Sequence, residues 1–134
     1  MPATLPPSSA ELQTRFRILV ADDNEMFRVA VRGLLQSLGH SVDVVSNGRE
    51  AVESASRENY DFVFLDIQMP VMDGFAAARS LRDAYNGGRS PRIIGFSGES
   101  ANRESYKTAG MDDFLIKPFR LADLVHALKS YAPS

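Results

Sequence analysis

Short apolar runs alternate with longer amphipathic stretches along most of the chain. The runs cover residues 17–21, 41–45, 61–65, 92–96 and 113–116. They are rich in Ile, Val, Leu and Phe, the residue types that favour β-strands. The run DFVFL at 61–65 is apolar nearly throughout, which is typical of a parallel strand covered on both faces. The pattern therefore predicts five strands, at least one of them central.

The stretches between these runs have the spacing of amphipathic helices. The first predicted helix spans residues 25–38, with apolar positions at Phe27, Ala30, Val31, Leu34, Leu35 and Leu38. Asn47 and Glu50 resemble a capping box that opens the second. The remaining predicted helices span residues 73–85, 100–109 and 119–131. Strands that alternate with helices imply an α/β fold, a parallel sheet with helices on both faces.

Chemically versatile side chains follow four of the five predicted strands. Asp22 and Asp23 follow the first strand, Asp66 the third, Ser97 the fourth and Lys117 the fifth. In an open parallel sheet, ligands bind beyond the carboxyl ends of the strands. We therefore expect three carboxylates, a hydroxyl and an ammonium to lie together at one edge of the sheet.

This set of side chains favours phosphoryl chemistry with a metal ion. Clustered carboxylates repel one another and need a cation. Oxygen ligands indicate a hard divalent ion such as Mg²⁺, with Mn²⁺ as the alternative. A carboxylate beside that ion can form an aspartyl phosphate, while Lys117 and Ser97 can bind phosphoryl oxygens. Each residue alone has an ordinary explanation as a helix cap, turn former or surface lysine, so the prediction depends on their coincidence.

Composition narrows the function classes. The chain has 134 residues, which suits one domain, and its net charge of -2 gives no indication of a nucleic-acid-binding face. The lack of cysteine excludes a disulfide scaffold, a thiolate zinc site and a cysteine nucleophile. It also fits a cytosolic protein. No apolar run approaches a membrane span, so we expect a domain without membrane contact of its own. The expected location is the cytoplasm, with the cytoplasmic part of a membrane-bound sensor kinase as the alternative. Residues 1–15 are predicted to be a linker or flexible tail, and residues 16–134 the domain.

Four motifs carry a family resemblance. They are RILVADDN at 17–24, DFVFLDIQMPVMDG at 61–74, GFSGES at 95–100 and DDFLIKPF at 112–119. Over residues 16–131 the chain resembles the receiver domains of two-component response regulators, and most of all those of hybrid histidine kinases. The resemblance implies a flavodoxin-like, doubly wound parallel sheet of five strands in the order 2-1-3-4-5, with five flanking helices.

The resemblance also implies roles for the residues at the strand ends. Asp66 resembles the phosphoacceptor, and Lys117 the lysine that pairs with the phosphoryl group. Asp22, Asp23, Asp66 and the backbone carbonyl of Gln68 resemble the ligands of Mg²⁺. The peptide bond after Lys117 precedes a proline and is often cis in this family.

A second group of positions resembles the residues that change conformation on phosphorylation and those that influence how long the phosphoryl group stays. Ser97 matches the hydroxyl residue that moves toward the phosphoryl group, and Phe114 matches the aromatic that reports the state. The family often has Tyr in place of Phe114, so the hydroxyl group that could hydrogen-bond at this position is absent here. Gln68 and Glu99 match the positions that influence hydrolysis of the aspartyl phosphate.

The resemblance implies a histidine kinase or a histidine phosphotransfer protein as the phosphoryl donor. Docking is expected near the start of helix 25–38, with at least one of Met26, Phe27 and Val29 on the docking face and extra core packing as the alternative. Phosphorylation is expected to alter the surface of residues 100–131, which a partner reads. A weak homodimer through that surface is left open.

Other functions remain as alternatives. A turnover enzyme of the haloacid dehalogenase type also forms an aspartyl phosphate, but it typically has a second Asp two positions on, where this chain has Gln68. A P-loop enzyme is disfavoured because GxxxxGK[ST] is missing. A flavin-binding domain would not need the carboxylates. A degenerate receiver that only binds partners is disfavoured by the intact acidic residues and lysine. We thus expect a signalling module, either free-standing or part of a larger protein, and no stand-alone turnover enzyme.

Overall fold

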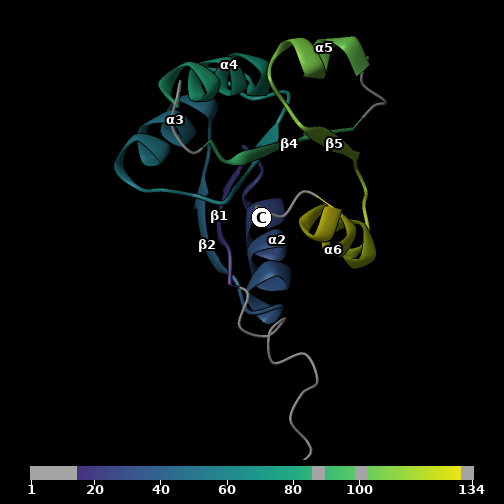
Figure 1. The fold of residues 1–134 in the computed structure, drawn as a ribbon. Helices are drawn as coiled ribbons and strands as arrows, with labels where there is room; N and C mark the ends of the chain where they lie inside the picture. Colours follow the sequence, from purple (N-terminus) through teal and green to yellow (C-terminus); the bar gives the residue numbers. More distant parts are fainter. Residues whose placement is uncertain (1–14, 86–89, 99–102, 131–134) are drawn as a thin grey trace, which may run out of the picture.

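Strands and helices alternate along the part of the chain that this computed structural model describes, residues 15–85, 90–98 and 103–130. The strands are β1 (Arg17–Ala21), β2 (Ser41–Val45), β3 (Phe62–Asp66), β4 (Arg92–Ser97) and β5 (Asp113–Ile116). The helices are α2 (Glu25–Ser37), α3 (Gly48–Arg57), α4 (Gly74–Ala84), α5 (Arg103–Thr108) and α6 (Leu121–Ser130). Figure 1 shows this succession along the sequence.

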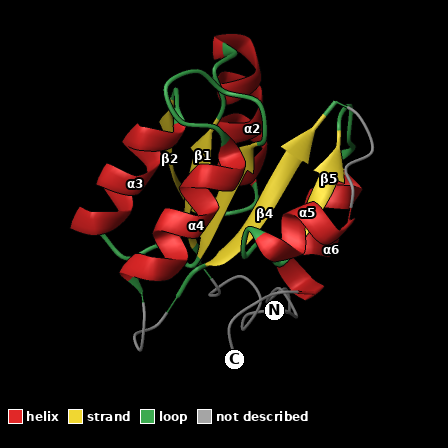
Figure 2. Ribbon diagram, turned by 90° about the horizontal axis from the view of Figure 1, so that it is seen from above, coloured by secondary structure: helices red, strands yellow, loops and turns green. Residues whose placement is uncertain are grey.

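The strands form one parallel sheet in the order β2-β1-β3-β4-β5. Helices α2 and α6 cover one face, and α3, α4 and α5 cover the other (Figures 1 and 2). The predicted flavodoxin-like architecture is therefore confirmed. Because all strands run the same way, their carboxyl ends share one edge, and the register pairs Asp66 of β3 with Phe96 of β4.

Two cores hold the helices against the sheet. The core under α3, α4 and α5 is mainly aliphatic and includes Leu19, Val63, Leu65, Ala77, Leu81 and Ile93. The core under α2 and α6 is rich in phenylalanine. There Phe62, Phe64 and Phe96 from β3 and β4 stack with interplanar angles of 12°. Every residue of β3 is buried, as expected of a central strand.

Helix α2 differs from its predicted orientation. Its inward stripe is narrower than the periodicity predicts, because only Val31 and Leu35 are fully buried and Phe27 is half-buried. Leu34 and Leu38 are each 37% exposed. The apolar positions of the predicted helix therefore do not all face the core. The helix packs against β1 and β2, at one margin of the sheet.

Helix boundaries agree with the predictions to within two or three residues. Asn24, Asn47 and Asp73 each cap a helix by accepting a backbone N–H through the side chain. The predicted capping box at Asn47 differs in one hydrogen bond: the Glu50 carboxylate accepts the N–H of Ser46, one residue before the cap. Helix α6 begins two residues later than predicted. The predicted start of α5 at residues 100–102 and the tail at 1–14 lie outside the described residues. Within the described ranges, no helix is long and apolar enough to cross a membrane.

Candidate functional site

Three carboxylates meet at the carboxyl edge of the sheet. Asp22 follows β1 and is fully buried, Asp23 beside it is exposed, and Asp66 ends β3 with 7% of its surface exposed. One carboxylate oxygen from each lies within 4.8 Å of the others. The fold thus brings together three residues that the sequence places on two separate strands.

Lys117, which follows β5 at the far end of the strand order, adds a cation to this group. The Lys117 ammonium donates to the Asp22 carboxylate at 2.7 Å and lies 3.6 Å from that of Asp66. Its backbone is fixed as well, because the Lys117 N–H donates to the carbonyl of Ser97 at 2.6 Å. The Lys117–Pro118 peptide is cis. The lysine is therefore held at the site by β4 and β5 together.

The electrostatic environment disfavours a charged Asp66 in the metal-free protein. Burial, the neighbouring charge of Asp22 and, to the smallest extent, the charge of Asp23 raise the pKa of Asp66 from its ordinary value of 3.8 to about 6. The Gln68 N–H, which donates to the Asp66 carboxylate at 3.0 Å, and the charge of Lys117 act in the opposite direction. A carboxylate in this position is one whose charge a bound cation would stabilise strongly.

The loop after β3 is shaped by close backbone contact. A Cβ at Gly74 would lie 2.4 Å from the carbonyl oxygen of Asp66, so only glycine fits there. Val71 has a φ of 70°, the left-handed region that β-branched residues rarely adopt. Its side chain is 71% exposed. Met69 and Met72 are half-buried, so the apolar loop is divided between packing and exposure.

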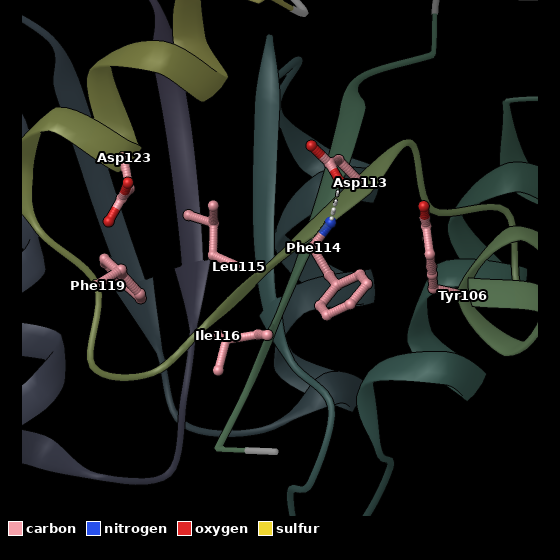
Figure 3. Close-up of a pocket in the computed structure, with 7 residues that line it drawn as sticks. All are labelled: Tyr106, Asp113, Phe114, Leu115, Ile116, Phe119 and Asp123. Atoms are coloured by element: carbon pink, nitrogen blue, oxygen red, sulfur yellow. Dashed lines mark hydrogen bonds between the residues drawn. The ribbon is translucent and has the colours of Figure 1, made fainter. Parts of the chain in front are cut away.

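The predicted switch residues lie beside the site. Ser97 ends β4 and is half-buried, and Gly98 has open space around its Cα where a side chain would project. Phe114 packs against Tyr106 of α5, with ring centroids 4.8 Å apart. Figure 3 shows these two rings on one side of β5, and Phe119 with Asp123 on the other. Glu99 lies outside the described residues.

Two further contacts at the site were not anticipated from the sequence. The Arg28 guanidinium donates to the backbone carbonyl of Asp22 at 2.7 Å. The ring of Phe27 lies under the Lys117 ammonium, 4.1 Å from nitrogen to centroid. Both residues are in the first turn of α2, and the Asn24 cap that starts this turn is the one sequence signal that places them near the Asp pair.

The donor set fits a hard divalent cation. It offers only oxygen from carboxylates, close enough to share one ion, with one carboxylate exposed toward solvent. Gln68 lines the same pocket as Asp23, so its backbone is near the group. Among the described residues, this is the one cluster of three or more acidic or His side chains close enough to hold a metal ion.

Comparison with known proteins agrees with this geometry. Residues 18–129 match the family model of the response regulator receiver domain. Hybrid signal transduction histidine kinase F of Dictyostelium discoideum is 35% identical over 125 residues, which cover 90% of this chain and 11% of that protein. The chain thus spans a small part of that relative's length.

Two solved structures are similar in sequence and fold. The receiver domain of sensor histidine kinase PA1611 from Pseudomonas aeruginosa, solved with magnesium in its active site cleft, is 37% identical with a TM-score of 0.78, over 88% of this chain and 98% of that one. The response regulator TrrA from Thermotoga maritima, in complex with Mg²⁺ and BeF, is 31% identical with a TM-score of 0.76, over 86% and 97%. Together with the family match over residues 18–129, these likenesses show that the chain belongs to the receiver domain family of two-component response regulators, with relatives among the hybrid histidine kinases.

Proposed function

We propose that Asp66 accepts a phosphoryl group from a phosphohistidine and that the resulting aspartyl phosphate switches the domain between two states. The observation that carries the proposal is the position of the Asp66 carboxylate. It lies within 4.8 Å of two further carboxylates and 3.6 Å from the Lys117 ammonium. Acid and cation groups in this arrangement suit phosphoryl transfer, in which positioning and charge neutralisation supply most of the catalysis.

Asp22, Asp23, Asp66 and the backbone carbonyl of Gln68 would hold Mg²⁺, or Mn²⁺, which accepts the same oxygen ligands. The bound ion would neutralise charge on the transferred group. An Asp66 carboxylate oxygen attacks phosphorus as the bond from phosphorus to the histidine nitrogen breaks. That nitrogen keeps the electron pair and takes up a proton. Lys117 pairs with a phosphoryl oxygen, and Ser97 donates its hydroxyl to another.

The switch follows from the new charge at Asp66. A phosphoryl group adds strong acceptor oxygens that draw Ser97 and Lys117 toward it. Phe114 then moves toward the space beside Ser97, and the surface of α5, β5 and α6 changes. The pocket lined by Tyr106, Phe114 and Phe119 lies on this surface (Figure 3). Gln68 and Glu99 tune the lifetime of the phosphorylated state.

The donor would be a histidine kinase or a phosphotransfer protein that docks on α2. This helix begins beside Asp23, and its first two turns expose apolar side chains. Met26 is 83% exposed and Val29 is 54% exposed, whereas Phe27 packs toward the core. Exposed apolar side chains next to the acceptor suit a helix of the donor better than they suit solvent. The exposure of Met26 and Val29 supports the expectation that at least one of these three residues lies on the docking face, whereas Phe27 fits the alternative of extra core packing.

The decisive experiment is intact mass spectrometry after incubation with Mg²⁺ and acetyl phosphate. The wild type should gain one phosphoryl group, and neither the Asp66→Asn variant nor the wild type in EDTA should do so. Asp83→Asn, an exposed acid on α4, serves as the matched control and should label normally. Labelling that persists in Asp66→Asn would contradict the assignment of the acceptor.

A further inference from the structure

The aromatic ring of Phe27 lies beneath the ammonium of Lys117. The Lys117 ammonium lies 4.1 Å from the centroid of Phe27, well within the roughly 6 Å limit for a cation–π contact. Lys117 is three-quarters buried, with 25% of its side chain exposed. An ammonium that has lost much of its water gains more from a ring face than one at an open surface.

The ring itself is firmly placed. The Phe27 N–H donates to the Asn24 side chain at 3.0 Å, which fixes the first turn of α2. Two near-perpendicular contacts then set the plane of the ring. Its centroid is 5.3 Å from that of Phe96 at 79°, and 5.7 Å from that of Phe119 at 89°. Phe96 directly precedes Ser97, and Phe119 lies two residues after the lysine. The ring is thus braced by the same two segments that carry the switch hydroxyl and the ammonium.

We infer that Phe27 is a positioning residue for the phosphoryl transfer, because its ring face holds the Lys117 ammonium over the site. This inference rests on the proposed function of Asp66. An ammonium has three N–H donors, and in the metal-free protein the Asp22 carboxylate takes one at 2.7 Å. A neutral ring attracts the cation but, unlike a carboxylate, does not compete with the phosphoryl group for the N–H donors. It therefore keeps Lys117 in place when a metal ion occupies Asp22, and it leaves N–H groups for a phosphoryl oxygen.

A structural role alone would make different predictions. If Phe27 only filled space between α2 and the sheet, leucine would serve nearly as well at the lysine, and loss of any phenylalanine in this core would have a similar effect. Phe16 provides the comparison. It is half-buried like Phe27 and packs edge-on against Phe62 in the same core, but it lies at the opposite end from Lys117. Phe16→Leu makes the same chemical change without touching the ammonium.

The first test observes the lysine directly and does not need phosphorylation. The chain has three lysines, Lys107, Lys117 and Lys129, so ¹³C-lysine labelling gives a simple spectrum of the Cε groups. Because the Lys117 ammonium lies over the ring of Phe27, the neighbouring Hε protons should be shifted upfield, with Lys117→Met identifying the signal. Phe27→Leu should abolish this shift, whereas Phe27→Tyr and Phe16→Leu should retain it. An unchanged Lys117 signal in Phe27→Leu would overturn the inference.

The second test measures the reaction. The rate constant for phosphorylation by acetyl phosphate with saturating Mg²⁺ should fall roughly two- to tenfold in Phe27→Leu, as expected for loss of one cation–π contact. Phe27→Tyr should stay within about twofold of the wild type, because the ring is kept. An equal loss in Phe16→Leu would indicate generic packing and refute the positioning role. A wild type that takes no phosphoryl group would refute the function of Asp66 instead, and the lysine spectrum would still decide the ring contact.

Discussion

The charge of Asp66 should destabilise the metal-free fold at neutral pH. Its pKa is about 6 in the folded protein, against an ordinary value of 3.8. Each unit of pKa difference corresponds to about 1.4 kcal/mol, so the full effect is about 3 kcal/mol. Asn has nearly the same shape and keeps the oxygen that accepts the Gln68 N–H, but it loses the attraction to Lys117. We therefore expect Asp66→Asn to raise the free energy of unfolding by about 1–3 kcal/mol at neutral pH in EDTA.

The pH dependence has a definite sign. An acid with a raised folded pKa binds more protons in the folded than in the unfolded state between about pH 4 and 6. The contribution of Asp66 to stability is therefore highest below this window, falls as the pH rises through it, and stays low above it. The advantage of Asp66→Asn over the wild type should shrink by about 2 kcal/mol when the pH is lowered from about 7.5 to about 4.5.

Urea unfolding at both pH values in EDTA measures these differences. Asp83→Asn removes an exposed acid from α4 and should change stability by less than about 0.5 kcal/mol. Adding Mg²⁺ at ten times its dissociation constant should stabilise the wild type by about 1.4 kcal/mol and the Asp66→Asn variant by less. A wild type as stable as Asp66→Asn in EDTA at neutral pH, with no difference in pH dependence, would refute the argument that burial and the neighbouring carboxylates disfavour a charged Asp66 in the folded state.

Three further changes test the surrounding framework. Gly74→Ala places a Cβ 2.4 Å from the carbonyl oxygen of Asp66. The free energy of unfolding, measured with urea, should fall by about 3 kcal/mol, and labelling by acetyl phosphate should slow. A variant as stable as the wild type would mean that the loop adjusts freely. Val71→Asn relieves a φ of 70° at an exposed position and should raise the free energy of unfolding by about 1 kcal/mol in the same assay. A loss of stability would contradict the strain assigned to Val71. Arg82→Lys keeps a positive charge near Asp112 but removes the several N–H donors of the planar guanidinium. The free energy of unfolding should fall by about 1–3 kcal/mol in the same assay.

Sequence reasoning succeeded where one physical signal was dominant. The bounds of β1, β2 and β5 were predicted correctly because polar residues flank short apolar runs. The strand-end residues were found because parallel strands must end at one edge. The exposure of Leu34 was not evident from the sequence because periodicity counts apolar residues and does not show how wide a surface the helix covers.

The contacts of Phe27 and Arg28 could not be predicted for a different reason. Both depend on the direction in which the first turn of α2 leaves the sheet, and that direction is set by the hydrogen bond from the Asn24 N–H to the Asp22 carboxylate at 2.9 Å and by the packing of Phe27 against Phe96. Neither has a signature in the spacing of residue types. The pattern shows that a side chain lies near the site, but not which functional group it contacts.

The opposite edge of the sheet shows how the fold tolerates an unfavourable site. There Arg82 donates to the carbonyls of Gly110 and Pro91 and to the carboxylate of Asp112, joining α4 to the starts of β4 and β5. Among the described residues, no buried side-chain nitrogen or oxygen lacks a hydrogen-bond partner. The carboxylate cluster and Val71, the one non-glycine residue with a positive φ in the described part of the chain, both lie at the carboxyl edge. Two apolar cores and the Arg82 contacts stabilise the rest of the sheet. Neutralising this edge should therefore relieve the repulsion there without a cost to the packing of the sheet, which is what the proposed phosphorylation switch would require.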